Sequence, residues 1–188
     1  MSHSKNSNLK FTTLEMAKIA VCTALLCVLS PLAIPMPILV PITLQVMIVI
    51  MVALVLKPIH ALIAQLLYTF LGIIGLPVFS GGKGGFAALA SPTGGFIIGF
   101  IIASFLVSLL KGKSDGKKSV IRYILVTIFV GVPSIYIPGI IFFAINQQVD
   151  LLTSAGIVAA SFILVDVVKC IIATLLAVPI NAALKNIR

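Results

Sequence analysis

Long apolar runs make up most of this sequence, and nearly all of its charged residues lie in the short stretches between those runs. Only 9% of the 188 residues are Asp, Glu, Lys or Arg, whereas 61% are hydrophobic. A typical soluble domain has about 25% charged residues, which cover a surface that faces water. The composition therefore excludes a soluble enzyme, a nucleic-acid-binding module and a disordered segment.

Six apolar segments follow one another along the chain, and they predict a single all-α integral membrane domain over residues 1–188. A helix needs about 20 apolar residues to cross a bilayer. We place six transmembrane helices at residues 14–32, 44–56, 59–75, 95–110, 120–144 and 155–184. The second is too short for a hydrocarbon core of about 30 Å, so we expect it to borrow length or to be partly buried. Pro133 and Pro138 should break or kink the fifth.

The distribution of basic residues predicts the orientation, because loops rich in Lys and Arg stay in the cytoplasm. Of thirteen basic residues, eleven lie on one side of the predicted helices: Lys5, Lys10, Lys18, Lys57, Lys111, Lys113, Lys117, Lys118, Arg122, Lys185 and Arg188. Of the other two, Lys83 falls on the opposite side and Lys169 lies within the sixth segment. We therefore expect a multi-pass protein of the cell (plasma) membrane with both termini in the cytoplasm.

Asp166 and Lys169 are the acid and the base that lie well inside an apolar segment. Their i,i+3 spacing places them on one face of the sixth predicted helix. A charge at membrane depth costs at least ~2.5–3.5 kcal/mol, so such residues usually face a cavity or a partner. The pair is either a site for a small polar ligand or an ion pair that neutralises itself and only holds the bundle together.

Two loops on the predicted outer side are unusual. Residues 75–95 are rich in glycine, which lets backbone amides approach a ligand closely, although a flexible linker would have the same composition. Residues 31–45 contain four prolines, with Thr43 and Gln45 as the polar side chains. Since proline stiffens the backbone, this segment could form a lid over the mouth of a bundle, or a re-entrant stretch that only packs.

In the first predicted helix, Ala20 and Ala24 form a pair of small residues four apart. Such a pair lets another helix come close, either within this chain or in a partner membrane subunit. The sequence contains no nucleotide-binding motif and no metal-binding pattern, so we expect no cofactor and no metal. Energy for uphill transport would then come from a partner or from a coupled ion.

Five stretches, taken together and in this order, resemble the BioY family, the biotin-binding S components of energy-coupling factor (ECF) transporters. They are Val-Pro-Ile-Thr-Leu-Gln at 40–45, Gly-Leu-Pro-Val-Phe at 75–79, the glycine run at 81–85, Pro-Thr-Gly-Gly at 92–95, and Asp166-x-x-Lys169. The resemblance covers residues 14–184. It implies six helices, an outward-facing biotin pocket, and a partner ECF module of one transmembrane coupling protein and two ATPases. It also implies that the subunit is not an enzyme and that Ala20 and Ala24 dock to the coupling protein.

The sequence departs from the family pattern at Ser91 and Val165, where glycine is usual, and at Lys83 inside the glycine run. None of these changes removes a charged residue of the expected site.

Biotin has a ureido ring with two N–H donors and one carbonyl acceptor, an apolar body and a carboxylate tail. Under this resemblance, Asp166 accepts from a ureido N–H, and Lys169 donates to the ureido carbonyl or reaches the carboxylate. The full set of expected ligand-binding residues is Asp166, Lys169, Gly81, Gly82, Lys83, Phe79, Thr93, Tyr68, Tyr136, Gln45 and Thr43.

In that set, Gly81, Gly82, Lys83 and Thr93 are candidates for the carboxylate, and the aromatic residues are candidates for the apolar body. Three alternatives remain open: an S component for another vitamin, an intramembrane enzyme that uses Asp166 and Lys169 as an acid–base pair, and a structural subunit without a ligand.

Overall fold

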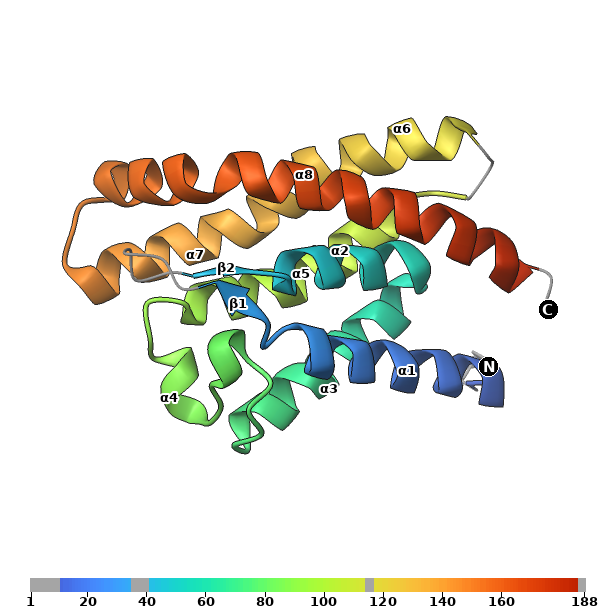
Figure 1. The fold of residues 1–188 in the computed structure, drawn as a ribbon, viewed down its shortest axis with the longest axis horizontal. Helices are drawn as coiled ribbons and strands as arrows, with labels where there is room; N and C mark the ends of the chain where they lie inside the picture. Colours follow the sequence, from blue (N-terminus) through green and yellow to red (C-terminus); the bar gives the residue numbers. More distant parts are fainter. Residues whose placement is uncertain (1–10, 35–40, 114–116, 186–188) are drawn as a thin grey trace, which may run out of the picture.

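The computed structural model describes residues 11–34, 41–113 and 117–185, and it is mostly helical (Figure 1). The α-helices are α1 (Thr13–Leu29), α2 (Gln45–Val55), α3 (Pro58–Ile73), α4 (Phe86–Leu89), α5 (Gly94–Leu110), α6 (Lys117–Val126), α7 (Val132–Gln147) and α8 (Leu151–Lys185). The other elements are the strands β1 (Ala33–Ile34) and β2 (Ile42–Thr43), the 3-10 turn η1 (Ser80–Gly82) and the π-helical turn η2 (Thr127–Gly131).

A helix lies in each of the six predicted apolar segments, with some differences at the ends. The first ends at Leu29 rather than at residue 32, because Pro31 has no N–H and cannot continue the hydrogen bonds of the helix beyond Ser30. The third begins on Pro58, a residue that fits the first turn of a helix because its missing N–H would have no partner there. The short helix α4 lies in the glycine-rich loop and was not predicted.

The fifth segment stays helical through both of its prolines. Helix α6, the turn η2 and α7 follow one another without a break, and the π-helical turn precedes Pro133 directly. Two helices of the described chain, Ser119–Gln147 and Leu151–Lys185, are long and apolar enough to cross a membrane by length and composition. Helices α2, α3 and α5 are apolar but shorter.

Close contact between α5 and α7 brings their backbones together, and it depends on glycine. A Cβ atom at Gly95 would lie 2.3 Å from the carbonyl oxygen of Pro138. A Cβ atom at Gly99 would lie 2.7 Å from the Cα of Ile135. These distances leave no room for a side chain, so the two glycines allow α7 to approach and present its inner face to the bundle.

Helix α2 occupies the centre of the bundle, with α1, α5 and α8 packed around it (Figure 1). All its residues from Gln45 to Leu54 are buried except Met47. Its 11 residues span only about 16 Å, so both ends stop inside the outline of the longer helices. The expectation of a short, buried second segment agrees with this arrangement.

Strands β1 and β2 form a small antiparallel ribbon that leads into α2. Ala33 pairs with Thr43, and Ile34 pairs with Ile42. The proline-rich segment predicted as a lid includes Pro35 and Pro37, and residues 35–40 lie outside the described part of the chain.

Helix α1 begins, and α8 ends, at the same end of the bundle, whereas the β ribbon and α4 lie at the other end (Figure 1). Lys5, Lys10 and Arg188, which contributed to the predicted orientation, lie outside the described residues.

Candidate functional site

A cavity opens at the end of the bundle that carries the β ribbon and α4. It holds about 630 Å³ of space, including its open mouth. Helices α2, α5, α7 and α8 form its walls, and the loop that contains η1 borders its mouth. The lining residues are Pro41, Thr43, Gln45, Val46, Phe79, Ser80, Lys83, Ala88, Thr93, Phe96, Ile97, Phe100, Tyr136, Phe162, Asp166 and Lys169.

An ion pair lies in the buried wall of this cavity. The Nζ of Lys169 donates to Oδ1 of Asp166 at 2.7 Å, and the hydroxyl of Tyr136 donates to Oδ2 at 2.8 Å. Asp166 is only 4% exposed, and both donors are 7% exposed. One helical turn of α8 holds the acid and the base, while α7 supplies the tyrosine. The pair that the sequence predicted is therefore formed, and it also faces a cavity.

These three groups retain hydrogen-bonding capacity for a ligand. A carboxylate oxygen can accept two hydrogen bonds, and an ammonium has three N–H donors. Among the described residues, each oxygen of Asp166 has one hydrogen-bond donor, and Lys169 donates to one acceptor. The cluster can thus both accept from and donate to the same polar group of a bound molecule.

Aromatic rings form much of the apolar wall. Phe96 meets Tyr136 edge-on, with ring centroids 6.4 Å apart and planes at 81°. This arrangement needs Gly139, because a Cβ atom there would lie 2.5 Å from the Phe96 ring. Phe100 and Phe162 complete the aromatic lining.

Phe96, Phe100 and Phe162 were not among the residues predicted from the sequence. Phe96 and Phe100 are four residues apart on α5, and Phe162 precedes Asp166 by four on α8, so they share faces with the site. This spacing was the feature of the sequence from which the three phenylalanines could have been predicted to line the site. The other lining residues that were not predicted are Pro41, Val46, Ser80, Ala88 and Ile97.

Gln45 and Thr43, two of the predicted ligand-binding residues, line the cavity at the N-terminal end of α2. The Gln45 side-chain nitrogen donates to the hydroxyl of Tyr68 at 2.7 Å, and that hydroxyl donates to the carbonyl oxygen of Val78 at 3.0 Å. Tyr68 is completely buried and is not part of the cavity lining. It holds Gln45 from behind instead of contacting the cavity.

The glycine run shapes the mouth but does not line it at Gly81 or Gly82. Both have a positive φ, 68° and 73°, which favours glycine. The Gly81 N–H donates to the carbonyl oxygen of Pro31, and the Gly82 N–H donates to that of Phe79. The two amides are therefore already used within the protein, and the turn they form presents Phe79 and Lys83 to the cavity.

Phe79 and Lys83 contribute in different ways. The ring of Phe79 is buried, meets Tyr68 edge-on at 5.7 Å, and lies where a Cβ atom of Gly72 would be. Lys83 is exposed at the mouth. Thr93 also lines the cavity, and its hydroxyl lies 2.9 Å from the hydroxyl of Ser91. The site thus combines a buried ion pair, an aromatic middle and a cationic mouth, which suits a small molecule that is apolar in its body and polar at both ends.

Ala20 and Ala24 do not line this cavity and are exposed on α1. Val21 and Val28 on the same helix are 60% and 68% exposed. The small residues are therefore not used for packing within the described chain.

Comparison with known proteins gives a consistent result. The family model described as "BioY family" matches residues 2–186. The chain is 37% identical over 168 residues to "Biotin transporter BioY2" of Lactococcus lactis subsp. cremoris, covering 89% of this chain and 90% of that protein. It is 35% identical to "Biotin transporter BioY" of Rhizobium etli, over 61% of this chain and 63% of that one.

A solved structure also matches. The crystal structure of the S-component for biotin from an ECF-type ABC transporter superposes with a TM-score of 0.80 and 29% sequence identity. The match covers 92% of this chain and 95% of that chain.

Proposed function

The chain belongs to the BioY family, and on that premise we propose that it is the biotin-binding S component of an ECF transporter. It captures biotin from outside the cell and delivers it inward together with an ATP-driven module. The relatives are named as transporters, and the matching structure is a transport component, so the subunit is a transporter part and not an enzyme.

The observation that carries this proposal is the buried cluster of Asp166, Lys169 and Tyr136 in an aromatic cavity. A ureido ring needs an acceptor for its N–H groups and a donor for its carbonyl. Asp166 supplies the acceptor and Lys169 supplies the donor, within one helical turn. Because both are buried, their hydrogen bonds to a ligand are shielded from water.

The rest of biotin matches the rest of the cavity. Its bicycle and chain pack against Phe96, Phe100 and Phe79, and its carboxylate is held at the mouth by Lys83 or Thr93. Gly81 and Gly82 are less suited to the carboxylate, since their N–H groups already donate to backbone carbonyls. Tyr68 acts indirectly, through its hydrogen bond to Gln45.

For the membrane arrangement, we propose one domain with six spanning helices: α1, α2, α3, α5, the continuous α6–η2–α7, and α8. Both termini are cytoplasmic, and the cavity opens to the outside. This orientation is supported by the basic residues and by the position of the cavity at the end opposite to the start of α1 and the end of α8 (Figure 1).

The proposed partners are a transmembrane coupling protein and two ATPases, with α1 as the docking helix. The exposed Ala20 and Ala24 leave a shallow strip where a second helix can approach closely. Ala20→Trp should abolish ATP-dependent biotin uptake in the presence of these partners, while biotin binding to the isolated subunit stays intact. Uptake at the wild-type rate in this variant would exclude the docking role.

The identity of the ligand is tested directly by mass spectrometry of the purified protein after denaturation, followed by calorimetry with biotin, thiamin and riboflavin. The proposal expects released, chemically unchanged biotin and tight binding of biotin alone. Tight binding of another vitamin without biotin binding would overturn the assignment, and an altered product would indicate an enzyme.

A further inference from the structure

We propose that a second, basic hollow at the opposite end of the bundle binds the headgroup of an anionic phospholipid. It lies among the start of α1, the ends of α2 and α5, the start of α3 and the end of α8, and holds about 1700 Å³ including its open side. Its cationic lining residues are Lys18, Lys57, Lys111, Lys113 and Lys185, and we call it the basic hollow.

The short length of α2 explains why the hollow exists. The helix ends at Val55, inside the bundle, so its last carbonyl groups need donors from neighbouring helices. The Nζ of Lys111 donates to the carbonyl oxygens of Ala53 at 2.9 Å and Leu54 at 2.8 Å, and also to that of Leu56. Lys111 is thereby committed to the C-terminal end of α2, where a cation is favourable.

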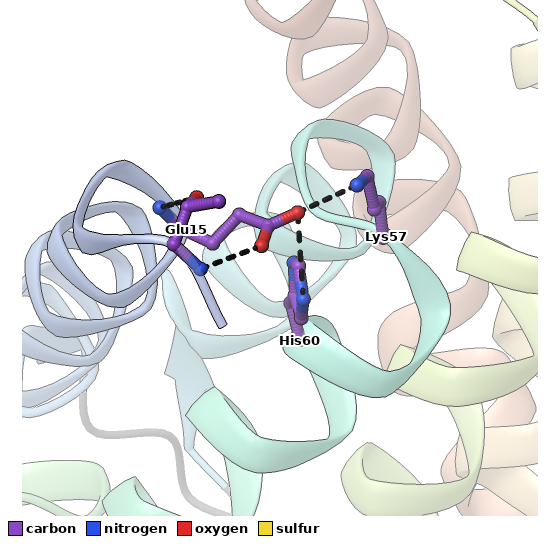
Figure 2. Close-up of polar contacts among 4 residues, drawn as sticks. Glu15, Lys57 and His60 are labelled. Carbon is purple, nitrogen blue, oxygen red and sulfur yellow. Dashed lines mark hydrogen bonds and ion pairs between the residues drawn. The ribbon is translucent and has the colours of Figure 1, made fainter. Parts of the chain in front are cut away.

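One acid faces this set of lysines, and it is already paired. Glu15 is the only carboxylate among the described residues that line the hollow. Its Oε1 accepts from Lys57 at 2.6 Å and lies 4.0 Å from Nε2 of His60, while its Oε2 accepts from the backbone of Thr12 (Figure 2).

The pairing leaves positive charge in excess. Lys57 is matched by Glu15, and Lys111 is matched by the carbonyls of α2, whereas Lys18 and Lys113 exceed the acids of the described lining. A concave site with charge of one sign concentrates the opposite charge. The hollow is therefore suited to an anionic group.

Apolar residues in the same lining favour a lipid over a soluble anion. Leu14 and Leu109 line the hollow and are 38% and 53% exposed, and Leu184 lies with them. A soluble phosphate would use the lysines alone, but a phospholipid would also cover the leucines with its glycerol and acyl groups. Helix ends lie at the depth of the headgroups, and basic pockets between spanning helices are known to bind them.

Native mass spectrometry of the purified, delipidated protein tests this inference. The probes are dioleoyl phosphatidylglycerol, dioleoyl phosphatidylcholine and soluble glycerol 1-phosphate. Each lysine near a headgroup contributes roughly fivefold in affinity, so K18Q/K113Q should retain about 25-fold less phosphatidylglycerol than the wild type. The matched control K18R/K113R keeps the positive charge at both positions and should retain the wild-type amount.

Preferential retention of phosphatidylglycerol over phosphatidylcholine, lost only in K18Q/K113Q, supports the inference. Equal retention of both lipids, or equal loss in both double variants, overturns it. Displacement of the lipid by millimolar glycerol 1-phosphate assigns the hollow to a soluble anion and also overturns it. A fourth outcome also overturns the inference: K18Q/K113Q retains the wild-type amount of lipid but no longer copurifies with the ECF subunits. That outcome would indicate that the hollow binds a protein partner.

Calorimetry with biotin on the same preparations separates this inference from the proposed function. Lys18 and Lys113 lie at the opposite end of α2 from the cavity, so biotin affinity should be the same in all three proteins. A failure of biotin binding in the wild type would count against the proposed function and leave the lipid result interpretable.

Discussion

Replacing Asp166 with Asn tests whether the buried ion pair binds the ligand or only holds α8 in place. The change keeps the shape of the side chain but removes its charge. It also puts an NH₂ group where one carboxylate oxygen now accepts from Lys169 at 2.7 Å or from Tyr136 at 2.8 Å. One of these donors then faces another donor, and the Lys169 ammonium, 7% exposed, loses its counter-charge.

The expected loss follows from the hydrogen bond that a charged acceptor would make to a ureido N–H. Such a bond contributes about 1.5–3 kcal/mol, which corresponds to roughly 10- to 150-fold in Kd. The D166N protein should therefore bind biotin at least tenfold more weakly. Its thermal stability should also fall, because a buried cation without its partner costs about 3–5 kcal/mol unless it loses its proton.

Isothermal calorimetry with biotin measures the first effect, and thermal unfolding in detergent measures the second. Tyr136→Phe is the matched control, because it removes one hydrogen bond to Asp166 and keeps the ion pair. Its loss of affinity should be smaller than that of D166N. If D166N bound biotin within threefold of the wild type while its melting temperature fell, the pair would be structural and the reasoning above would be wrong.

Three further predictions concern the fold. Gly95→Ala should lower the free energy of unfolding by about 1–3 kcal/mol, since its Cβ would meet the backbone of α7 at 2.3 Å. The control is Gly156→Ala, where a Cβ would have no atom within 4 Å, and it should be neutral or stabilise by up to ~1 kcal/mol. Chemical unfolding of both variants compares these effects. Lys111→Met should destabilise by about 1–3 kcal/mol, because the carbonyl of Ala53 loses the Lys111 donor and that of Leu54 keeps only Asn181; an unchanged melting temperature would contradict this. Hydrogen bonds from the Thr153 side chain and backbone hold the pKa of Asp150 below its usual 3.8. This contribution to stability is therefore present above pH about 4 and is lost as the pH falls through the lowered pKa. Asp150→Asn should make the melting temperature less dependent on pH between about 5 and 3.

Hydropathy and prolines located the helices well, because the requirement to bury apolar surface acts on each segment by itself. The short second segment was correctly expected to be unusual, since 11 residues cannot span a bilayer core. The effect of Pro133 was predicted less well. A π-helical turn precedes this proline, and the turn contacts α5, which lies far from it in the sequence.

Within the site, Asp166 and Lys169 could be found from sequence because charge inside an apolar run is costly wherever the helix lies. Which other residues reach the site depends on how each helix is rotated about its own axis. Tyr136 was expected to pack against the ligand, but its hydroxyl also donates to Asp166 from a different helix. Tyr68 was expected in the cavity, and it instead lies behind Gln45.

The sequence by itself determined that this chain is apolar and helical and that one acid and one base lie deep in its last long helix. These properties depend on composition and local spacing, which any arrangement of the helices must satisfy. Only the tertiary structure decided that glycines on α5 let α7 bring a tyrosine to the acid. It also decided that the short α2 leaves an aromatic cavity at one end and a basic hollow at the other. The physical reason is that a cavity is formed by side chains of several helices, and their relative rotation and depth are set by contacts between segments far apart in the chain.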